Sequence, residues 1–328
     1  MKILVLGGTL FLSKAVATEA IARGHDVTCA ARGESGLVPV GARLVPLDRS
    51  APEFGSLVED WDAVVDVART PSWVRDALAA LADRTKHWTF ISTINVYADD
   101  ATPHGTPETL PLLEPIPDDR EQTGPEVYGG NKVACEQAVQ SSAKASLVIR
   151  PGLIAGPGDP SGRYSYWPSR LADGGEVLAP DHADRDVQLV DVRDLAAWIV
   201  HCAETGTTGV FDGTSPVARL GDVLAQTAAG VGAAPELTWV DPDFLVEREV
   251  NPWSGARSLP LWLPLPDYAG LLSHDVTASL EAGLRIRPIE ETARDTLAWL
   301  RDNPDEMKTG LTRAEERQVL EDWHTIRA

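Results

Sequence analysis

The stretch Lys2-Ile3-Leu4-Val5-Leu6-Gly7-Gly8-Thr9 opens the chain and decides its fold. Its first half is a short, fully apolar run, which is typical of a buried strand in a parallel sheet. Two glycines end that run. Residues 13–23 then show apolar positions at helical spacing, and Gly24 stands in the place of a C-terminal helix cap. A strand, a glycine turn and a helix in this order predict the first unit of an α/β fold.

The same alternation continues to residue 212. Strand-like apolar runs separated by segments with helical spacing predict a parallel, doubly wound sheet. The predicted strands are 3–6, 26–31, 43–47, 63–68, 87–92, 146–149, 187–190 and 209–212, and the predicted helices are 13–23, 72–83, 127–142, 192–204 and 313–323. Beyond residue 212 we expect mainly helix, interrupted by a Pro-rich and Trp-rich stretch at 251–267.

A change of amino-acid composition after Gly152 predicts two lobes. The segment 153–183 is rich in Gly, Pro, Tyr and Trp, a composition that suits loops around a pocket. We expect a Rossmann-type dinucleotide-binding domain over 1–152, with 185–212 returning to it. A smaller, mixed substrate-binding lobe is expected over 153–184 and 213–328.

Composition limits the partners. The 328 residues are 43% hydrophobic and 24% charged, which is ordinary for a soluble globular protein. The formal net charge is −20 and no basic cluster is visible, so we expect no nucleic-acid partner. Three scattered cysteines without metal-ligand spacing favour a reducing compartment and predict no metal site. Without a signal-peptide pattern or a long apolar run, we expect a cytoplasmic protein without a membrane partner, with a homodimer as its candidate assembly.

A second motif, Tyr128-Gly129-Gly130-Asn131-Lys132, places a Tyr and a Lys four residues apart and so on one face of a helix. The reference pKa of a phenol is about 10, and a neighbouring ammonium favours the anion. The pair is therefore a candidate proton donor or acceptor. The alternative to a catalytic pair is that both are partly exposed helix residues without a role in chemistry. The surrounding α/β pattern favours the catalytic interpretation.

The glycine turn is the candidate cofactor site. In α/β proteins a dinucleotide pyrophosphate rests on the helix N-terminus that follows the first strand. Gly7 and Gly8 allow the turn, and the backbone around Thr9, Leu10, Phe11 and Leu12 offers N–H groups to the phosphates. The glycine fingerprint is incomplete because Leu10 and Ser13 stand where the second and third glycines usually lie.

The end of the second predicted strand indicates which dinucleotide binds. An acidic residue there usually marks NAD, whereas an Arg accommodates the additional phosphate of NADP. The chain has Ala31-Arg32 at this point, and a guanidinium binds phosphate well, so we favour NADP(H) over NAD(H). An exposed surface Arg is the alternative for Arg32. Asp48 and Arg49 are placed to contact the adenine end, or else they form an ordinary loop turn.

Several candidate residues fall at predicted strand ends, where ligands of such sheets bind. They are Gly7, Asp48, Ala68, Thr93 and Pro151. Their agreement in position is stronger evidence for one ligand-binding edge than any single motif.

Together these residues resemble the extended short-chain dehydrogenase/reductase superfamily, of the NAD(P)-dependent epimerase/dehydratase type. The resemblance covers most of the chain, and its opening is similar to the branch that begins Gly-Gly-Thr-x-Phe-Leu. The motifs that carry it are the glycine turn, Asp48, Phe90-Ile91-Ser92-Thr93 with Val96-Tyr97, the Tyr128/Lys132 pair, Arg150-Pro151-Gly152, Gly156-Pro157-Gly158 and the run 185–196. Ser13 departs from this branch, where we expect it to loosen helix–strand packing or to weaken cofactor binding.

The resemblance implies roles at the matching positions. Thr93 would hydrogen-bond a substrate oxygen, Tyr128 would exchange a proton with it, and Lys132 would bind the nicotinamide ribose and lower the pKa of the phenol. Pro151, Leu153 and Ile154 would position the carboxamide of the nicotinamide. Arg185 falls where nucleotide-sugar members bind a diphosphate, with an ion pair to a neighbouring Asp as the alternative.

The substrate-binding candidates are less determined. Asn95 follows Thr93 where the family's sugar dehydratases carry acidic residues, so a dehydratase is disfavoured. Arg163 and Arg185 are candidates to hold an anionic group. The aromatic residues Tyr164 and Trp167, with Tyr166, Trp253 and Trp262, would line a pocket or else serve as packing residues.

Three functions follow from these observations. The first is an NADP(H)-dependent oxidoreductase that transfers a hydride to or from a carbonyl, imine or alcohol carbon. The second is an epimerase of a nucleotide sugar or another sugar with retained NAD(P). The third is a non-catalytic, cofactor-binding or RNA-binding relative, which the intact triad of Thr93, Tyr128 and Lys132 and the acidic composition oppose.

Overall fold

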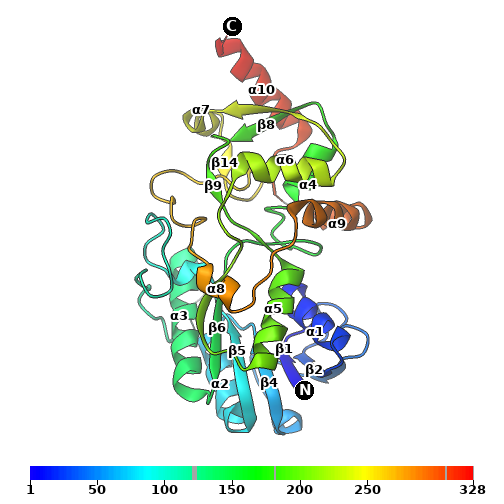
Figure 1. Cartoon of the computed structure of the whole chain (residues 1–328), viewed down its shortest axis with the longest axis vertical. Coiled ribbons are helices and arrows are strands. Elements are labelled where there is room, and N and C mark those ends of the chain that lie inside the picture. The colour runs from blue at the N-terminus through cyan, green and yellow to red at the C-terminus, as the bar shows by residue number, and fades with distance from the viewer. Residues whose placement is uncertain (120–123, 181, 307–308, 328) are drawn as a thin grey trace.

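The computed structural model describes residues 1–119, 124–180, 182–306 and 309–327. A seven-stranded parallel sheet lies at its centre, with the strand order β11-β6-β5-β4-β1-β2-β3 (Figure 1). Its strands are β1 Lys2–Leu6, β2 Asp26–Ala31, β3 Arg43–Pro46, β4 Trp61–Asp66, β5 Thr85–Ile91, β6 Ser146–Pro151 and β11 Gly209–Gly213. The predicted Rossmann-type fold is confirmed.

Helices cover both faces of this sheet (Figure 1). In chain order the helices are α1 Phe11–Ala22, α2 Pro71–Leu81, α3 Pro125–Ser142, α4 Tyr166–Ala172, α5 Val192–Thr205, α6 Leu220–Gly230, α7 Pro242–Glu247, α8 Thr277–Glu281, α9 Ile289–Asp302 and α10 Arg313–Arg327. Helix α1 packs against α5 on one face, and α2 packs against α3 on the other. Successive strand side chains point to opposite faces, so Ile3 and Val5 join the core under α1 while Leu4 and Leu6 join the core under α2.

The order of the strands fixes where a ligand can bind. Strand β1 lies between β2 and β4. From β1 the chain first adds β2 and β3 on one side and then adds β4, β5, β6 and β11 on the other, so the strand order reverses at β1. Ligands of open α/β sheets bind outside the carboxyl ends of the strands at such a reversal. The glycine turn after β1 and the residues after β4 therefore lie at the expected ligand-binding edge.

A second lobe lies beyond this edge (Figure 1). Its hydrophobic core joins residues from α4, α6, α9 and α10 with the parallel pair β8 and β13, and it extends to Val96 and Val133 of the first lobe. The shorter strands of the chain are β7 Ile154–Ala155, β8 Glu176–Pro180, β9 Asp186–Val187, β10 Val190–Asp191, β12 Ala218–Arg219, β13 Glu236–Val240, β14 Asn251–Pro252 and β15 Ser258–Leu259.

Two sequence expectations differ from this architecture. The predicted strand 187–190 is instead β9 and β10, which pair with β12 and β7 in two separate small sheets. The side chain of Gln188 between them donates to the carbonyl oxygens of Ser215 and His274, 2.7 and 2.9 Å away, so the chain is held to neighbouring loops here rather than to one sheet. The region after residue 212, expected to be mainly helical, also contains β12, β13, β14 and β15.

The chain crosses back to the first lobe near its helix α8. Leu284 belongs to the hydrophobic core under α1 and α5, and the hydroxyl of Ser279 donates to the carbonyl oxygen of Asp212 over 2.7 Å. Trp198 of α5 donates to the carbonyl oxygen of Ala282 over 3.0 Å. A segment expected in the substrate lobe therefore covers one end of the Rossmann sheet.

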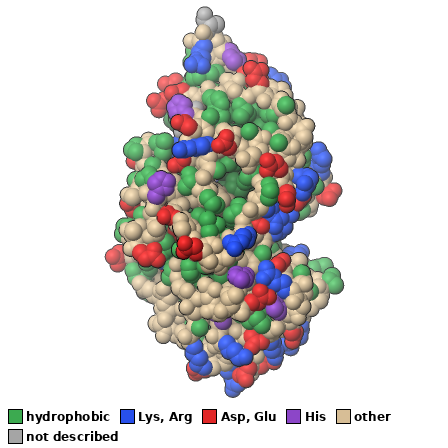
Figure 2. Space-filling model, viewed as in Figure 1, with side chains coloured by type: hydrophobic (Ala, Val, Ile, Leu, Met, Phe, Trp, Pro, Cys, Tyr) green, Lys and Arg blue, Asp and Glu red, His purple; other side chains and the backbone are tan. Residues whose placement is uncertain are grey.

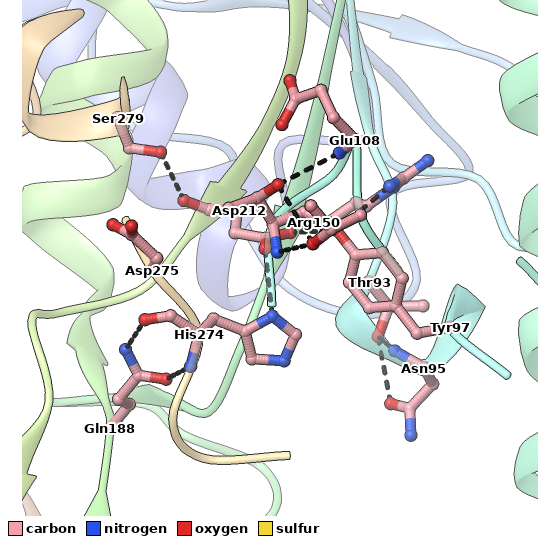
Figure 3. Close-up of polar contacts among 12 residues, drawn as sticks. Thr93, Asn95, Tyr97, Glu108, Arg150, Gln188, Asp212, His274, Asp275 and Ser279 are labelled. Atoms are coloured by element: carbon pink, nitrogen blue, oxygen red, sulfur yellow. Dashed lines mark hydrogen bonds and ion pairs between the residues drawn. The ribbon is translucent and has the colours of Figure 1, made fainter. Parts of the chain in front are cut away.

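A buried polar network joins the two parts of the molecule (Figure 3). Glu136 of α3 accepts two hydrogen bonds from Arg150 of β6, with N–O distances of 3.1 and 2.7 Å. Arg150 also donates to the hydroxyl of Tyr97 over 3.0 Å, and that hydroxyl donates to Asp212 of β11 over 2.7 Å. His274, from the returning segment, contacts the other oxygen of Asp212 at 3.0 Å. Buried charges are tolerated where each finds a partner, and this chain of contacts supplies them.

Replacing Glu136 by Gln tests that network. The variant keeps the size of the side chain but leaves the buried Arg150 without its counter-charge, so we expect the free energy of unfolding to fall by about 3–5 kcal/mol. Urea denaturation followed by circular dichroism measures this change. The control is Lys86→Met, which breaks a surface pair with Asp62 whose lysine side chain is 79% exposed, and which we expect to cost about 0–1 kcal/mol. Equal losses of unfolding free energy in the two variants would contradict the role of Glu136 as the counter-charge of the buried Arg150.

Candidate functional site

The glycine turn has the shape that a pyrophosphate needs. Gly8 has a φ of +103°, and a Cβ built on it would lie 2.4 Å from the sulfur of Cys29 on β2. Only glycine fits at this point, where β1 ends and the chain turns towards α1. Helix α1 begins at Phe11 with Leu10 as its N-cap, and no side chain caps it. Its first N–H groups therefore have no side-chain partner and point to where an anion would bind.

Ser13 has a role in this turn that the sequence expectation did not include. Its hydroxyl accepts a hydrogen bond from the N–H of Gly8 at 3.0 Å and donates to the carbonyl oxygen of Leu10 at 2.8 Å. The serine thus closes the turn with two hydrogen bonds in place of the close packing that a third glycine would give. Thr9 is buried beside it, whereas Leu10 is exposed. The residues present fit a dinucleotide pyrophosphate, with Phe11 and Leu12 supplying N–H groups.

The residues expected at the adenine end lie in different environments. Arg32, at the end of β2, is exposed, and its Nε lies 3.7 Å from a carboxylate oxygen of Glu34. Asp48 is also exposed, and its carboxylate accepts from the N–H and the hydroxyl of Ser50 at 2.9 and 2.7 Å. Arg49 points inward, where its guanidinium lies 3.3 Å from both oxygens of the buried Asp66. Its inward position makes Arg49 a support for the end of β4, because Asp66 in turn accepts from the N–H of Ala68 at 3.0 Å.

Gly129 lets α3 approach the turn at residues 93–96 closely. A Cβ built on Gly129 would lie 2.0 Å from the carbonyl oxygen of Asn95, in the turn that follows β5. The helix therefore passes against residues 93–96 with no side chain between them. This approach places Tyr128 beside Thr93, whose hydroxyl also donates to the side-chain oxygen of Asn95 over 3.0 Å (Figure 3).

Tyr128 lies among positive charges. Burial raises the pKa of its phenol, while Arg69, the hydroxyl of Thr93 and Arg163 oppose that rise. The carbon at the centre of the Arg69 guanidinium lies 5.9 Å from the centroid of the Tyr128 ring. Burial is the largest of these influences, so the pKa of the phenol stays above its usual value, and the neighbouring cations limit the rise.

Lys132 is more deeply buried than the sequence alone suggested. It is 2% exposed, and its ammonium donates to the carbonyl oxygens of Ala68 and Ile91 at 2.7 and 2.5 Å. Burial lowers its pKa to about 8. The ammonium also lies 4.5 Å from the centroid of the Phe90 ring. Lys132 thus joins the carboxyl ends of β4 and β5.

Three further cofactor candidates follow β6. Pro151 ends that strand, and Leu153 is buried with its carbonyl oxygen accepting from the N–H of Val190 at 2.9 Å. Ile154 pairs with Val190 in the short sheet of β7 and β10. They lie on the chain between β6 and the second lobe.

The five substrate candidates do not form one cluster. Asn95 and Arg163 belong to the surroundings of Thr93 and Tyr128. Arg185 donates to the carbonyl oxygen of Leu263 and lines a different pocket of about 270 Å³. Besides Arg185, that pocket is lined by Pro103, His182, Asp184, Asp186, Arg219, Leu263, Leu265, Tyr268, Ala269 and Leu272.

Tyr164 and Trp167 require a correction. Both side chains are fully buried in the core of the second lobe, where Tyr164 contacts the hydroxyl of Thr227 at 3.0 Å and Trp167 donates to the carbonyl oxygen of Pro260 at 3.2 Å. Their aromatic area stabilises the lobe and offers no surface to a substrate. The packing alternative, and not the pocket, holds for these two residues.

Sequence reasoning missed Arg69 and Asp159, and it named Trp253 only as an aromatic that lines a pocket or packs in the core. Arg69 directly follows Ala68, a recognised strand-end residue, so its position alone was a usable signal. Trp253 stacks on Arg163, with the guanidinium carbon 4.8 Å from the ring centroid, although the two residues are far apart in the sequence. No local pattern indicates that contact.

On the face drawn in Figure 2, hydrophobic side chains gather in a hollow near mid-height and charged side chains surround it.

Comparison with known proteins agrees with this geometry. Residues 3–212 match the NAD dependent epimerase/dehydratase family. The chain belongs to that family. The matched segment contains the glycine turn, the Thr93 turn and the Tyr128/Lys132 pair. In the part of the chain that the structure describes, no helix is long and apolar enough to cross a membrane.

Two curated relatives are similar over part of their length. Ceramide reductase of Caulobacter vibrioides is 30% identical over 158 residues, which are 46% of this chain and 49% of that protein. The chloroplast stem-loop binding protein of 41 kDa b from Arabidopsis thaliana is 25% identical over 258 residues, or 72% of this chain and 64% of that protein. The chain therefore spans about half to two thirds of the relatives that it matches.

Among solved structures, the UDP-glucose 4-epimerase of Thermus thermophilus in complex with NAD has a TM-score of 0.61 to this chain. The alignment covers 92% of this chain and 99% of that one at 19% sequence identity. At that identity the likeness establishes the fold.

Proposed function

We propose that this protein is an NADP(H)-dependent oxidoreductase that acts on a carbonyl, imine or alcohol carbon of a small molecule. The observation that carries the proposal is Tyr128, held beside Thr93 and surrounded by the cations Arg69 and Arg163 at the ligand-binding edge of the sheet. When bound, the nicotinamide supplies or accepts the hydride. Tyr128 would donate a proton to the substrate oxygen in reduction, or take it in oxidation.

Each member of the triad has a distinct task in this proposal. The hydroxyl of Thr93 would hydrogen-bond the substrate oxygen and orient it towards Tyr128. The ammonium of Lys132 donates to two backbone carbonyl oxygens and has three hydrogens, so one N–H remains for the nicotinamide ribose. Because Lys132 is anchored in this way, its charge would act on Tyr128 from a fixed position.

The proposed NADP(H) preference rests on the end of β2. Arg32 is exposed there, no carboxylate occupies the last position of the strand, and the 2′-phosphate of NADP would meet a guanidinium. Glu34, 3.7 Å from Arg32, is the residue that would bind the ribose hydroxyls of NAD instead. The two side chains therefore define the alternatives for cofactor choice.

Two other functions have specific support. An epimerase of nucleotide sugars is supported by Arg185, which lines a pocket beside the second lobe, and by the fold shared with UDP-glucose 4-epimerase. An RNA-binding function is supported by the partial likeness to the chloroplast stem-loop binding protein, and the formal charge of −20 opposes it. The partial likeness to ceramide reductase supports the reductase.

Cofactor preference can be measured by titrating the nucleotide-free protein with NADPH and NADH while following nicotinamide fluorescence. We expect tighter binding of NADPH, and we expect Arg32→Ala to weaken NADPH about 10- to 100-fold while leaving NADH nearly unchanged, because one charge-assisted contact is lost. Arg84→Ala, which changes an exposed arginine elsewhere, serves as the matched control. Preference for NADH, or NAD that resists removal, would instead favour the epimerase.

The role of Tyr128 is tested by Tyr128→Phe. We expect this variant to bind the dinucleotide as the unmodified protein does and to lose turnover by about 10²- to 10⁴-fold, since only the proton donor is removed. Turnover is followed as NADPH oxidation across a panel of carbonyl and imine compounds. Near-normal turnover in the variant would remove Tyr128 from the mechanism.

A further inference from the structure

A second feature of the Tyr128 site is its concentration of guanidinium groups. Arg69 lies over the Tyr128 ring, and Arg163 acts on the same phenol from the loop between β7 and α4. The chain as a whole carries a formal charge of −20, so a local excess of cations is a departure from its general composition. Cations that lie close to one point attract an anion there.

Arg163 is the more informative of the two. Its guanidinium stacks on the ring of Trp253, and its Nε is buried without a hydrogen-bond partner. Among the described residues it forms no ion pair. The residue as a whole is only partly buried, but a buried donor without a partner is unfavourable, and a water, an ion or a ligand can complete it.

The same loop contains an unpaired acceptor. Asp159 is 2% exposed, and its Oδ1 accepts from the N–H and the hydroxyl of Ser161 at 2.8 and 2.7 Å. Its Oδ2 is buried without a hydrogen-bond partner. Burial raises the pKa of Asp159 and Arg163 opposes that rise, so the two groups interact electrostatically without forming an ion pair. One unmet donor and one unmet acceptor therefore lie on a single loop beside the catalytic tyrosine.

The loop lies against two parts of the chain that are distant in sequence. The hydroxyl of Thr309 donates to the carbonyl oxygen of Ser161 over 2.8 Å, and a Cβ built on Gly158 would lie 3.7 Å from the ring of Phe11 at the glycine turn. Trp253 has a φ of +73°, which is rare for a bulky residue. The loop thus connects the proposed cofactor site to the guanidinium of Arg163.

We propose that Arg163, assisted by Arg69, binds an anionic group of the substrate, a carboxylate or a phosphate, while the reacting oxygen of the same molecule faces Tyr128. This inference rests on the proposed function and specifies its substrate class: a small carbonyl or alcohol compound that also carries an anion. Trp253 orients the guanidinium, and Asp159 accepts from a neighbouring hydroxyl or amide of the substrate. The site is separate from the pocket that Arg185 lines.

Calorimetric titration of the whole protein, with and without NADP⁺, tests the inference without requiring turnover. The probes are oxamate, its neutral isostere oxamide, and inorganic phosphate. We expect oxamate or phosphate to bind at least tenfold more tightly than oxamide, and we expect Arg163→Met to weaken that binding about 10- to 100-fold through loss of a charge-assisted contact. Whichever anion binds more tightly identifies the carboxylate or the phosphate as the favoured group.

A matched control removes an arginine that also stacks on a tryptophan but lies far from the site. Arg327 lies 4.6 Å from the centroid of the Trp323 ring at the exposed end of α10, so Arg327→Met should leave anion binding unchanged (Figure 1). Equal binding of all three probes would overturn the inference. Anion binding that survives Arg163→Met and is lost in Arg185→Met would also overturn it, because the anion would then occupy the other pocket.

The two proposals fail in different ways. Anion binding that depends on Arg163, in a protein that never oxidises NADPH, would support the anion site and contradict the oxidoreductase. NADPH oxidation that depends on Tyr128, but that is equally fast in Arg163→Met with oxo acids and with their neutral esters, would support the oxidoreductase and contradict the anion site.

Discussion

The position of α3 depends on charged side chains that must find partners inside the protein. Tyr128, Lys132 and Glu136 are spaced by four residues and so share one face of that helix. Glu136 is paired with Arg150 of β6, and Lys132 donates to the carbonyl oxygens of Ala68 and Ile91 at the ends of β4 and β5. Two buried charges with fixed partners determine the rotation and the height of the helix. The third member of the row, Tyr128, is thereby brought to Thr93.

The same network reaches the second lobe. Arg150 contacts Tyr97, Tyr97 contacts Asp212, and Asp212 contacts His274 on the segment that returns from the lobe (Figure 3). A substrate bound between the lobes would therefore be held by parts that share one set of buried contacts. Proton transfer requires such fixed geometry, because the reacting groups must lie within hydrogen-bonding distance.

The sequence predicted the Rossmann sheet well because its strands are apolar on both faces and its turns contain glycine. It also indicated the edge at which ligands bind, since several candidate residues fell at strand ends. It did not distinguish an aromatic residue in a pocket from one in a core, so both alternatives stayed open for Tyr164 and Trp167, which the structure places in the core. The inward direction of Arg49 could not be predicted either, because it depends on the buried carboxylate of Asp66 on another strand.

Contacts between distant segments account for the other features that the sequence did not predict. The stacking of Arg163 on Trp253 and the contact of Asp212 with His274 each join residues that no periodicity relates. The split of the predicted strand 187–190 into two short strands follows from the side chain of Gln188, which binds neighbouring backbone groups. Local pattern identifies elements, whereas these long-range polar contacts decide how the second lobe meets the first.

The central claim is that the glycine turn and Tyr128 belong to one dinucleotide site. A crystal structure of the protein with NADP⁺ tests it most directly. The account predicts a pyrophosphate against the N–H groups of Phe11 and Leu12, with the nicotinamide ring beside Tyr128 and Lys132 in contact with its ribose. A dinucleotide bound away from the glycine turn, or a nicotinamide ring remote from Tyr128, would contradict it.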